Sequence, residues 1–200
     1  MKNKRYAAFL FDRFADHQLS MILTALGRGN AFELETFSAS GRTVVAASSM
    51  RITPHTNLAN MAPEDFDLLL LPGGSQWERG DNLEIFPLIM AAAGLRPLIA
   101  IGEAILALAD LGLLDNIPHT GDSPGYLERF CPEYKGARFF RPQSFVNAET
   151  ILTVSGEAFA AAGHGMLGLF DTLQQISANH HELFDPACQT TGARIDRYCR

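Results

Sequence analysis

Blocks of apolar residues and blocks of mixed polarity alternate along this chain and predict strands and helices in turn. Short, almost continuous apolar runs predict buried strands at residues 6–11, 67–71, 97–101 and 151–154. Between and after them, apolar residues recur at helical spacing, which predicts helices that cover residues 19–26, 83–93, 103–111, 123–131 and 158–176. Strands and helices that alternate in this order predict an α/β fold, a mostly parallel central sheet sandwiched by helices in a flavodoxin-like three-layer arrangement.

The segment between the first two buried strands has a different pattern. Residues 32–37 alternate between apolar and polar side chains, and residues 43–45 and 50–52 are short β candidates, so we expect a further strand and a small ribbon here. The buried run at 67–71 ends at Pro72-Gly73-Gly74, which predicts a tight turn at the carboxyl end of a central strand. Because open parallel sheets bind ligands outside the carboxyl ends of their strands, we expect the site at this edge.

Length and composition predict a single folded domain. The chain has 200 residues, of which 47% are hydrophobic, enough for one sizeable core. We place that core at about residues 5–175 and treat residues 179–200 as a polar C-terminal extension. The net charge is −6, and lysine and arginine are scattered, so there is no basic patch for a nucleic acid.

Targeting signals and a metal or disulfide framework are not indicated. The basic start Met1–Arg5 precedes an apolar run too short for a signal peptide, and Glu103 and Asp110 interrupt the longest apolar stretch, so neither secretion nor a membrane span is expected. Three cysteines, Cys131, Cys188 and Cys199, lack metal-ligand spacing and favour reduced thiols. We therefore expect a cytoplasmic protein without a cofactor or a bound metal.

Three local motifs are interpreted as structural rather than functional. The glycines of Gly163-His-Gly-Met-Leu-Gly168 match a dinucleotide-binding pattern but lie inside a predicted helix, where small residues allow close helix packing. His180-His181-Glu182 is interpreted as solvated surface, because adjacent histidines on a helix point in different directions. Cys131 is expected to be a small buried hydrophobe at a helix end.

Three segments together resemble the ThiJ/PfpI superfamily, a branch of the class I glutamine amidotransferase-like fold. They are residues 67–74, residues 100–114 and residues 151–156 running into a helix, and the resemblance extends over about residues 5–175. Residues 113–120 with 134–136 are similar to the bacterial subgroup known as intracellular protease or amidase. The resemblance implies a homodimer and a site with a cysteine on a strand-to-helix elbow, a glutamate on the first helix and a nearby histidine.

Carried onto this sequence, the resemblance places residues other than the expected ones at two of these positions. Gly102 occupies the cysteine position and Gln18 the glutamate position, whereas His119 matches the histidine. Gly73 and Gly74 match the turn that, with the amide of the residue after the nucleophile, would line an oxyanion-binding pocket. A nucleophile elbow strains a residue with a side chain, whereas glycine adopts positive φ without that strain. The resemblance thus implies a retained pocket without its nucleophile.

Two classes of function follow. The first is a non-catalytic or weakly catalytic protein that binds a small metabolite in this pocket. The second is a glyoxalase-like, deglycase-like or amidase-like hydrolase in which Glu103 or His119 acts on a water as general base. At this stage Glu103 is either a helix N-terminal acid stabilised by the helix dipole or a pocket carboxylate, and His119 is either a site residue or a surface histidine. A purely structural role in a dimer is the third possibility.

Overall fold

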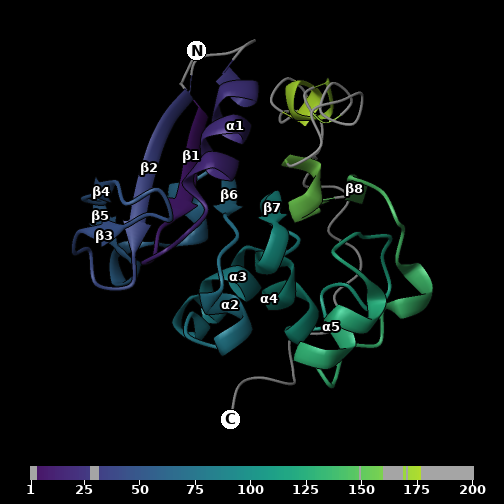
Figure 1. Ribbon diagram of the computed structural model, residues 1–200. Coiled ribbons are helices and arrows are strands. Elements are labelled where there is room, and N and C mark those ends of the chain that lie inside the picture. Colours follow the sequence, from purple (N-terminus) through teal and green to yellow (C-terminus); the bar gives the residue numbers. More distant parts are fainter. Residues whose placement is uncertain (1–3, 28–31, 149, 160–168, 170, 177–200) are drawn as a thin grey trace.

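A seven-stranded sheet lies at the centre of the protein (Figure 1). The computed structural model describes residues 4–27, 32–148, 150–159, 169 and 171–176. The strand order is β5-β2-β1-β6-β7-β9-β8, and every neighbouring pair is parallel except the antiparallel pair of β8 with β9. The strands of this sheet are β1 (Lys4–Phe9), β2 (Phe32–Ser38), β5 (Thr56–Asn57), β6 (Leu68–Leu71), β7 (Leu98–Ile101), β8 (Phe145–Ala148) and β9 (Ile151–Val154). The predicted α/β fold with a mostly parallel central sheet is therefore confirmed.

The central strands consist of unbroken apolar runs because helices and loops cover both faces of the sheet. All four residues of β6 and all four of β7 have no exposed surface. The register pairs Leu71 with Ala100, and Ile101 with Val154, so the three strands end at one edge. The residues that follow these strands are thereby brought together, which positions the candidate site.

The helices begin and end where local sequence signals place them. They are α1 (Asp16–Gly27), α2 (Gln76–Arg79), α3 (Phe86–Ala92), α4 (Ile105–Asp110) and α5 (Pro124–Phe130). Helix α1 lies apart from the group formed by α2, α3 and α4 (Figure 1). As predicted, Ser123 caps α5 by accepting a hydrogen bond from the Tyr126 amide at 3.0 Å, and Pro124 is its first residue.

Several predicted boundaries differ from the structure. Strand β1 begins two residues earlier than predicted and ends at Phe9, because the chain then turns through Arg13, whose φ is +66°, toward α1. The predicted helix 83–93 starts as a 3-10 turn, Leu83–Ile85, and becomes α-helical at Phe86, with Pro87 in the first turn. The predicted helix 103–111 likewise starts as a 3-10 turn, Gly102–Ala104. Each boundary depends on backbone turns that periodicity does not encode.

Short elements were missed altogether. Strands β5 and β8 and helix α2 were not predicted, because two to four residues carry too little periodicity to detect. The predicted ribbon is confirmed as the antiparallel pair β3 (Val44–Val45) and β4 (Arg51–Ile52). The predicted helix 158–176 lies largely outside the described residues. Its start is a 3-10 turn, Gly156–Phe159, and residues 171–176 are helical.

Candidate functional site

A strand-to-helix elbow follows the central strand β7. The strand ends at Ile101, and buried Gly102 opens the 3-10 turn that leads into α4 with a φ of +54°, in the left-handed region that favours glycine. A Cβ atom at position 102 would lie 3.5 Å from Gln18 Nε2 and 3.6 Å from the Cα of Gly156, which are ordinary contacts. The space above Gly102 is thus bordered by α1 and by the turn after β9.

The turn after β6 lies against the same space. The Gly73 amide donates to Gln18 Oε1 at 3.2 Å, and the Gly74 amide donates to Glu103 Oε2 at 2.9 Å. A Cβ on Gly73 would lie 2.5 Å from that Glu103 oxygen and 2.6 Å from Gln18 Oε1. Only glycine at position 73 lets both acceptors approach the backbone so closely. Gly73, Gly74, Gly102, Gln18 and Glu103 are therefore neighbours in one site.

Two other contacts hold this turn in place. The indole Nε1 of Trp77 donates to the Pro72 carbonyl at 2.9 Å, and the Ala15 amide donates to the Gly73 carbonyl at 2.8 Å. The first of these ties the turn to α2 and the second ties it to the start of α1. The positions of the glycine amides are consequently fixed by the scaffold.

Four carboxylates interact electrostatically at the site. They are Glu78, Glu103, Asp122 and Glu157, and Tyr126 donates its hydroxyl to Glu78 Oε1 at 2.9 Å. Partial burial of Asp122 raises the pKa of its carboxyl, and the negative charges of the three glutamates raise it further. Burial and the hydrogen bond to Glu78 raise the pKa of the Tyr126 hydroxyl. The surroundings of Asp122 therefore carry concentrated negative charge.

His119 is fully buried and both of its ring nitrogens are engaged within its own loop region. Nδ1 lies 2.8 Å from the Ile117 carbonyl, which only accepts, so Nδ1 carries the hydrogen and Nε2 accepts from the Tyr134 hydroxyl. Burial lowers the pKa of His119, and the Arg141 guanidinium lowers it further. The imidazole is held neutral, in contact with Tyr134 rather than presented to the space above Gly102.

Cys131 lies away from the elbow. As predicted, it is a buried residue that directly follows a helix. Its thiol lies 3.3 Å from the Leu106 carbonyl, to which it donates, and burial raises its pKa to about 12. Cys188 and Cys199, the 163–168 glycine motif, His180-His181-Glu182 and the 179–200 extension lie outside the described residues.

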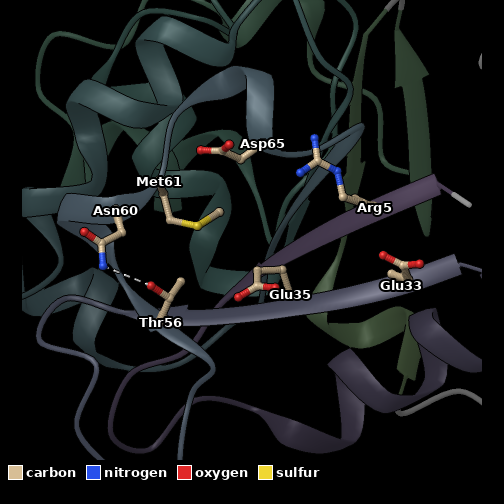
Figure 2. Close-up of a pocket in the computed structure, with 7 residues that line it drawn as sticks. All are labelled: Arg5, Glu33, Glu35, Thr56, Asn60, Met61 and Asp65. Atoms are coloured by element: carbon tan, nitrogen blue, oxygen red, sulfur yellow. Dashed lines mark hydrogen bonds between the residues drawn. The ribbon is translucent and has the colours of Figure 1, made fainter. Parts of the chain in front are cut away.

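Two hollows in the surface are not lined by the glycines of the elbow or of the turn, although Trp77 and Glu78 line the second of them. One, of about 210 Å³, lies over β1 and β2 (Figure 2) and is lined by Arg5, Glu33, Glu35, Thr56, Asn60, Met61 and Asp65. Several of its polar groups already form hydrogen bonds within the protein: Arg5 donates to the Glu64 carbonyl, Asn60 donates to Thr56, and Asp65 accepts from the Ala62 amide.

The second hollow, of about 240 Å³, lies between α2, α4 and α5 and includes Asn82 and Cys131. The elbow remains the better candidate, because its groups converge at the carboxyl ends of parallel strands.

Sequence reasoning missed several residues of this site, among them Gly156 and Asp122. Gly156 opens the 3-10 turn that follows β9, so the rule that sites form at carboxyl ends of strands was the signal that could have found it. Asp122 precedes the Ser123 cap of α5, and no residue pattern marks it. Only the folded chain brings its carboxyl to within 3.9 Å of the point that a Cβ on Gly156 would occupy.

Neither a metal centre nor a membrane span emerges from the described residues. Across them, no three or more histidine, cysteine, aspartate or glutamate side chains are grouped in a way that could hold a metal ion. No helix in the same part of the chain is both long enough and apolar enough to cross a bilayer.

Comparisons with known proteins agree with the fold. Residues 4–163 match the DJ-1/PfpI family. Two uncharacterized proteases of Bacillus subtilis are similar in sequence: YoaZ is 26% identical over 79% of each chain, and YdeA is 27% identical over 78% of this chain and 77% of its own.

Solved structures give the same result. A DJ-1 superfamily protein of Agrobacterium tumefaciens superposes with a TM-score of 0.74 at 25% identity, over 92% of this chain and 93% of its own. A thiJ/pfpI family protein of Bacillus anthracis has the same TM-score of 0.74 at 26% identity, over 86% and 84%. The family match over most of the chain, on this sheet and these turns, shows that the protein belongs to the DJ-1/PfpI family.

Proposed function

We propose that this protein binds a small molecule non-covalently at the elbow after β7 and does not carry out thiol catalysis there. The observation that carries the proposal is Gly102 at the turn, with a φ of +54° and only hydrogen in the place of a side chain. By the resemblance described above, catalytic relatives hold a cysteine at this position and a glutamate where Gln18 lies. A thiolate is required for covalent attack of that kind, and no sulfur is placed at this turn.

The remaining described thiol does not substitute for the missing one. Cys131 donates its hydrogen to the Leu106 carbonyl, and a pKa of about 12 leaves it as a neutral thiol at physiological pH. Gln18 supports the same conclusion, because an amide cannot exchange a proton with a thiol as a carboxyl can. The turn at Gly73 and Gly74, where the resemblance places ligand binding, is nevertheless held beside the elbow by hydrogen bonds to Gln18 and Glu103.

Two measurements test this proposal. Iodoacetamide labelling of the native protein followed by peptide mass spectrometry tests the thiols, and Cys131 is expected to stay unmodified, because it is buried and its pKa is about 12. Thermal unfolding with a metabolite panel tests binding, because a ligand of the folded state stabilises by RT ln(1 + [L]/Kd). Gly102→Ala should abolish the stabilisation by a ligand bound at the elbow. Turnover of methylglyoxal at the rate of an active relative would contradict the proposal.

A hydrolase that uses water is the second candidate, and the carboxylate group favours it. Glu103 is held beside the elbow, and burial and neighbouring negative charges raise the pKa of Asp122, so two carboxyl groups in different surroundings are available as base and acid. Glu103 fits the role of base better than His119, whose ring nitrogens are both engaged in a buried position. Hydrolysis of a model amide or turnover of methylglyoxal that is lost in Glu103→Gln but kept in His119→Gln would favour this candidate.

We further propose that the protein is a cytoplasmic homodimer. The family resemblance supports dimerisation, and three cysteines without the spacing of a disulfide framework support the location. Large apolar side chains exposed on the surface, among them Met50, Leu83 and Leu95, are the groups that an interface would cover. Multi-angle light scattering measures the assembly.

A further inference from the structure

The side-chain amide of Gln18 points a hydrogen-bond donor at the space above Gly102. Gln18 is only 6% exposed, and its Oε1 accepts from the Gly73 amide. Its Nε2 makes no hydrogen bond to any residue that the structure describes. That nitrogen lies 3.5 Å from the point a Cβ on Gly102 would occupy and 4.0 Å from the corresponding point on Gly156. A buried amide donor in this position selects a ligand with an acceptor atom.

The backbone donors that an anion would need at this site are already used. Gln18 Oε1 and Glu103 Oε2 accept from the amides of Gly73 and Gly74, the two groups expected to bind an oxyanion. One of these acceptors is itself a carboxylate oxygen. A negatively charged ligand would have to displace both and approach Glu103, so the geometry disfavours carboxylates and phosphates.

The surrounding charge selects for a cation. Glu78, Glu103, Asp122 and Glu157 interact electrostatically, and none of them forms an ion pair with a described lysine, arginine or histidine. Asp122 Oδ1 lies 3.9 Å from the same point above Gly156 that Gln18 Nε2 approaches to 4.0 Å. A carboxylate and an amide donor therefore border one small space. The carboxylates do not converge as metal ligands do within the described chain, which favours an organic cation.

We propose that the surface in front of Gly102 and Gly156, which Gln18 Nε2 and Asp122 Oδ1 border, binds a small primary amine with an ether, hydroxyl or carbonyl oxygen two carbons from its nitrogen. The oxygen accepts a hydrogen bond from Gln18 Nε2, and the ammonium group is held by the carboxylate of Asp122. This inference rests on the proposed non-covalent function and specifies the class of ligand. Gln18 Nε2 and Asp122 Oδ1 both lie within 4.0 Å of one point, so they are no more than about 8 Å apart, a span that two hydrogen bonds and a two-carbon separation can bridge.

The test compares probes of matched shape by ligand-observed NMR titration of the full chain. The pair 2-methoxyethylamine and n-butylamine differ only in the ether oxygen, which accepts hydrogen bonds but donates none. Methoxyacetate carries the same oxygen beside a negative charge. We expect 2-methoxyethylamine to bind about fivefold more tightly than n-butylamine, which is the effect of one hydrogen bond. Methoxyacetate should not bind, and added salt should weaken both amines.

Two nearly isosteric variants separate the two contacts. Gln18→Glu keeps an acceptor for the Gly73 amide but loses the Nε2 donor, so the preference for the ether over n-butylamine should disappear while amine binding persists. Asp122→Asn should weaken both amines by about tenfold and keep the preference, because it removes charge and not the donor. Glu84→Gln removes an exposed carboxylate that does not belong to the four around Asp122, so it should change neither the affinity for the amines nor the preference for the ether. Circular dichroism of each variant confirms folding.

The outcomes separate this inference from the function on which it rests. Equal binding of the two amines, or a preference that survives Gln18→Glu, would overturn the inference. If neither amine binds but a neutral or anionic panel compound does, and Gly102→Ala abolishes that binding, the inference fails and the proposed function stands. Methylglyoxal turnover at the rate of an active relative would instead overturn the proposed function.

Discussion

Replacing Gly102 by alanine is expected to cost stability through backbone strain alone. At a φ of +54°, an L-residue is disfavoured by about 1–2 kcal/mol, whereas the new Cβ would meet Gln18 Nε2 at 3.5 Å and Gly156 at 3.6 Å without a clash. Alanine also restricts the unfolded chain, which offsets about 0.4–1 kcal/mol. The expected net loss is therefore about 1 kcal/mol, or a fall in Tm of about 2–4 °C for a domain of this size.

Two other glycines provide matched controls for this substitution. Gly80 has a φ of +70° and no heavy atom within 4 Å of its Cβ position, so Gly80→Ala should lose about the same stability from strain alone. Gly125 lies in α5, also faces open space and does not have a positive φ, so Gly125→Ala should be neutral or stabilising.

The assay is urea denaturation followed by circular dichroism, with the slope m compared between variants. A loss in Gly102→Ala well below that in Gly80→Ala would show that residue 102 is not held in the left-handed region. A loss above about 3 kcal/mol, the scale of an overpacked core, would show that the space above it is not open.

Three further predictions follow from the same geometry. Gly102→Cys combined with Gln18→Glu should give a thiol whose alkylation midpoint is displaced from that in Gly102→Cys alone, and midpoints near about 8.5 in both would refute the assigned positions. Burial lowers the pKa of His119, so its contribution to stability is complete above about pH 6.5 and lost as the pH falls through the folded-state pKa. NMR titration should give His119 a pKa below about 6.5, and the acid-side fall in stability should be shallower in His119→Gln; a pKa at or above about 6.5 would contradict this prediction. Light scattering should give a dimer at micromolar concentrations, and a monomer throughout would remove the proposed assembly.

The central sheet could be predicted because burial on both faces leaves a direct mark on the sequence. Residues 67–71 and 97–101 are nearly all aliphatic, and each is followed by glycine at the turn, so strand, turn and edge could all be read from the sequence. The capped start of α5 was equally clear, since Ser123 and Pro124 act through local hydrogen bonding and a fixed φ.

The arrangement of the candidate site could be predicted only in part. The strand-end rule and the family resemblance indicated Gly73 and Gly102, but not which acceptors occupy the backbone amides. The contact between Gly74 and Glu103 joins residues 29 positions apart, and that between Gly73 and Gln18 joins residues 55 apart. Such pairings follow from tertiary packing and leave no periodic signal.

The location of Asp122 illustrates the same limit. It occupies the position before a helix cap, where an acidic residue is unremarkable in sequence. Its pKa is raised by burial and then by three glutamates supplied by separate segments of the chain. Charge density of this kind is a property of the assembled surface, so no single segment predicts it.

The two ends of the sheet also limit how copies of this protein can associate. At one end, β5 has only two residues, Thr56 and Asn57, and at the other the four residues of β8 run antiparallel to the rest. Edges this short offer few free backbone groups to an added strand, which protects the sheet against growth by edge pairing. A dimer of this protein is consequently expected to join through side chains of helices and loops, leaving the strand-end site of each copy on its own separate sheet.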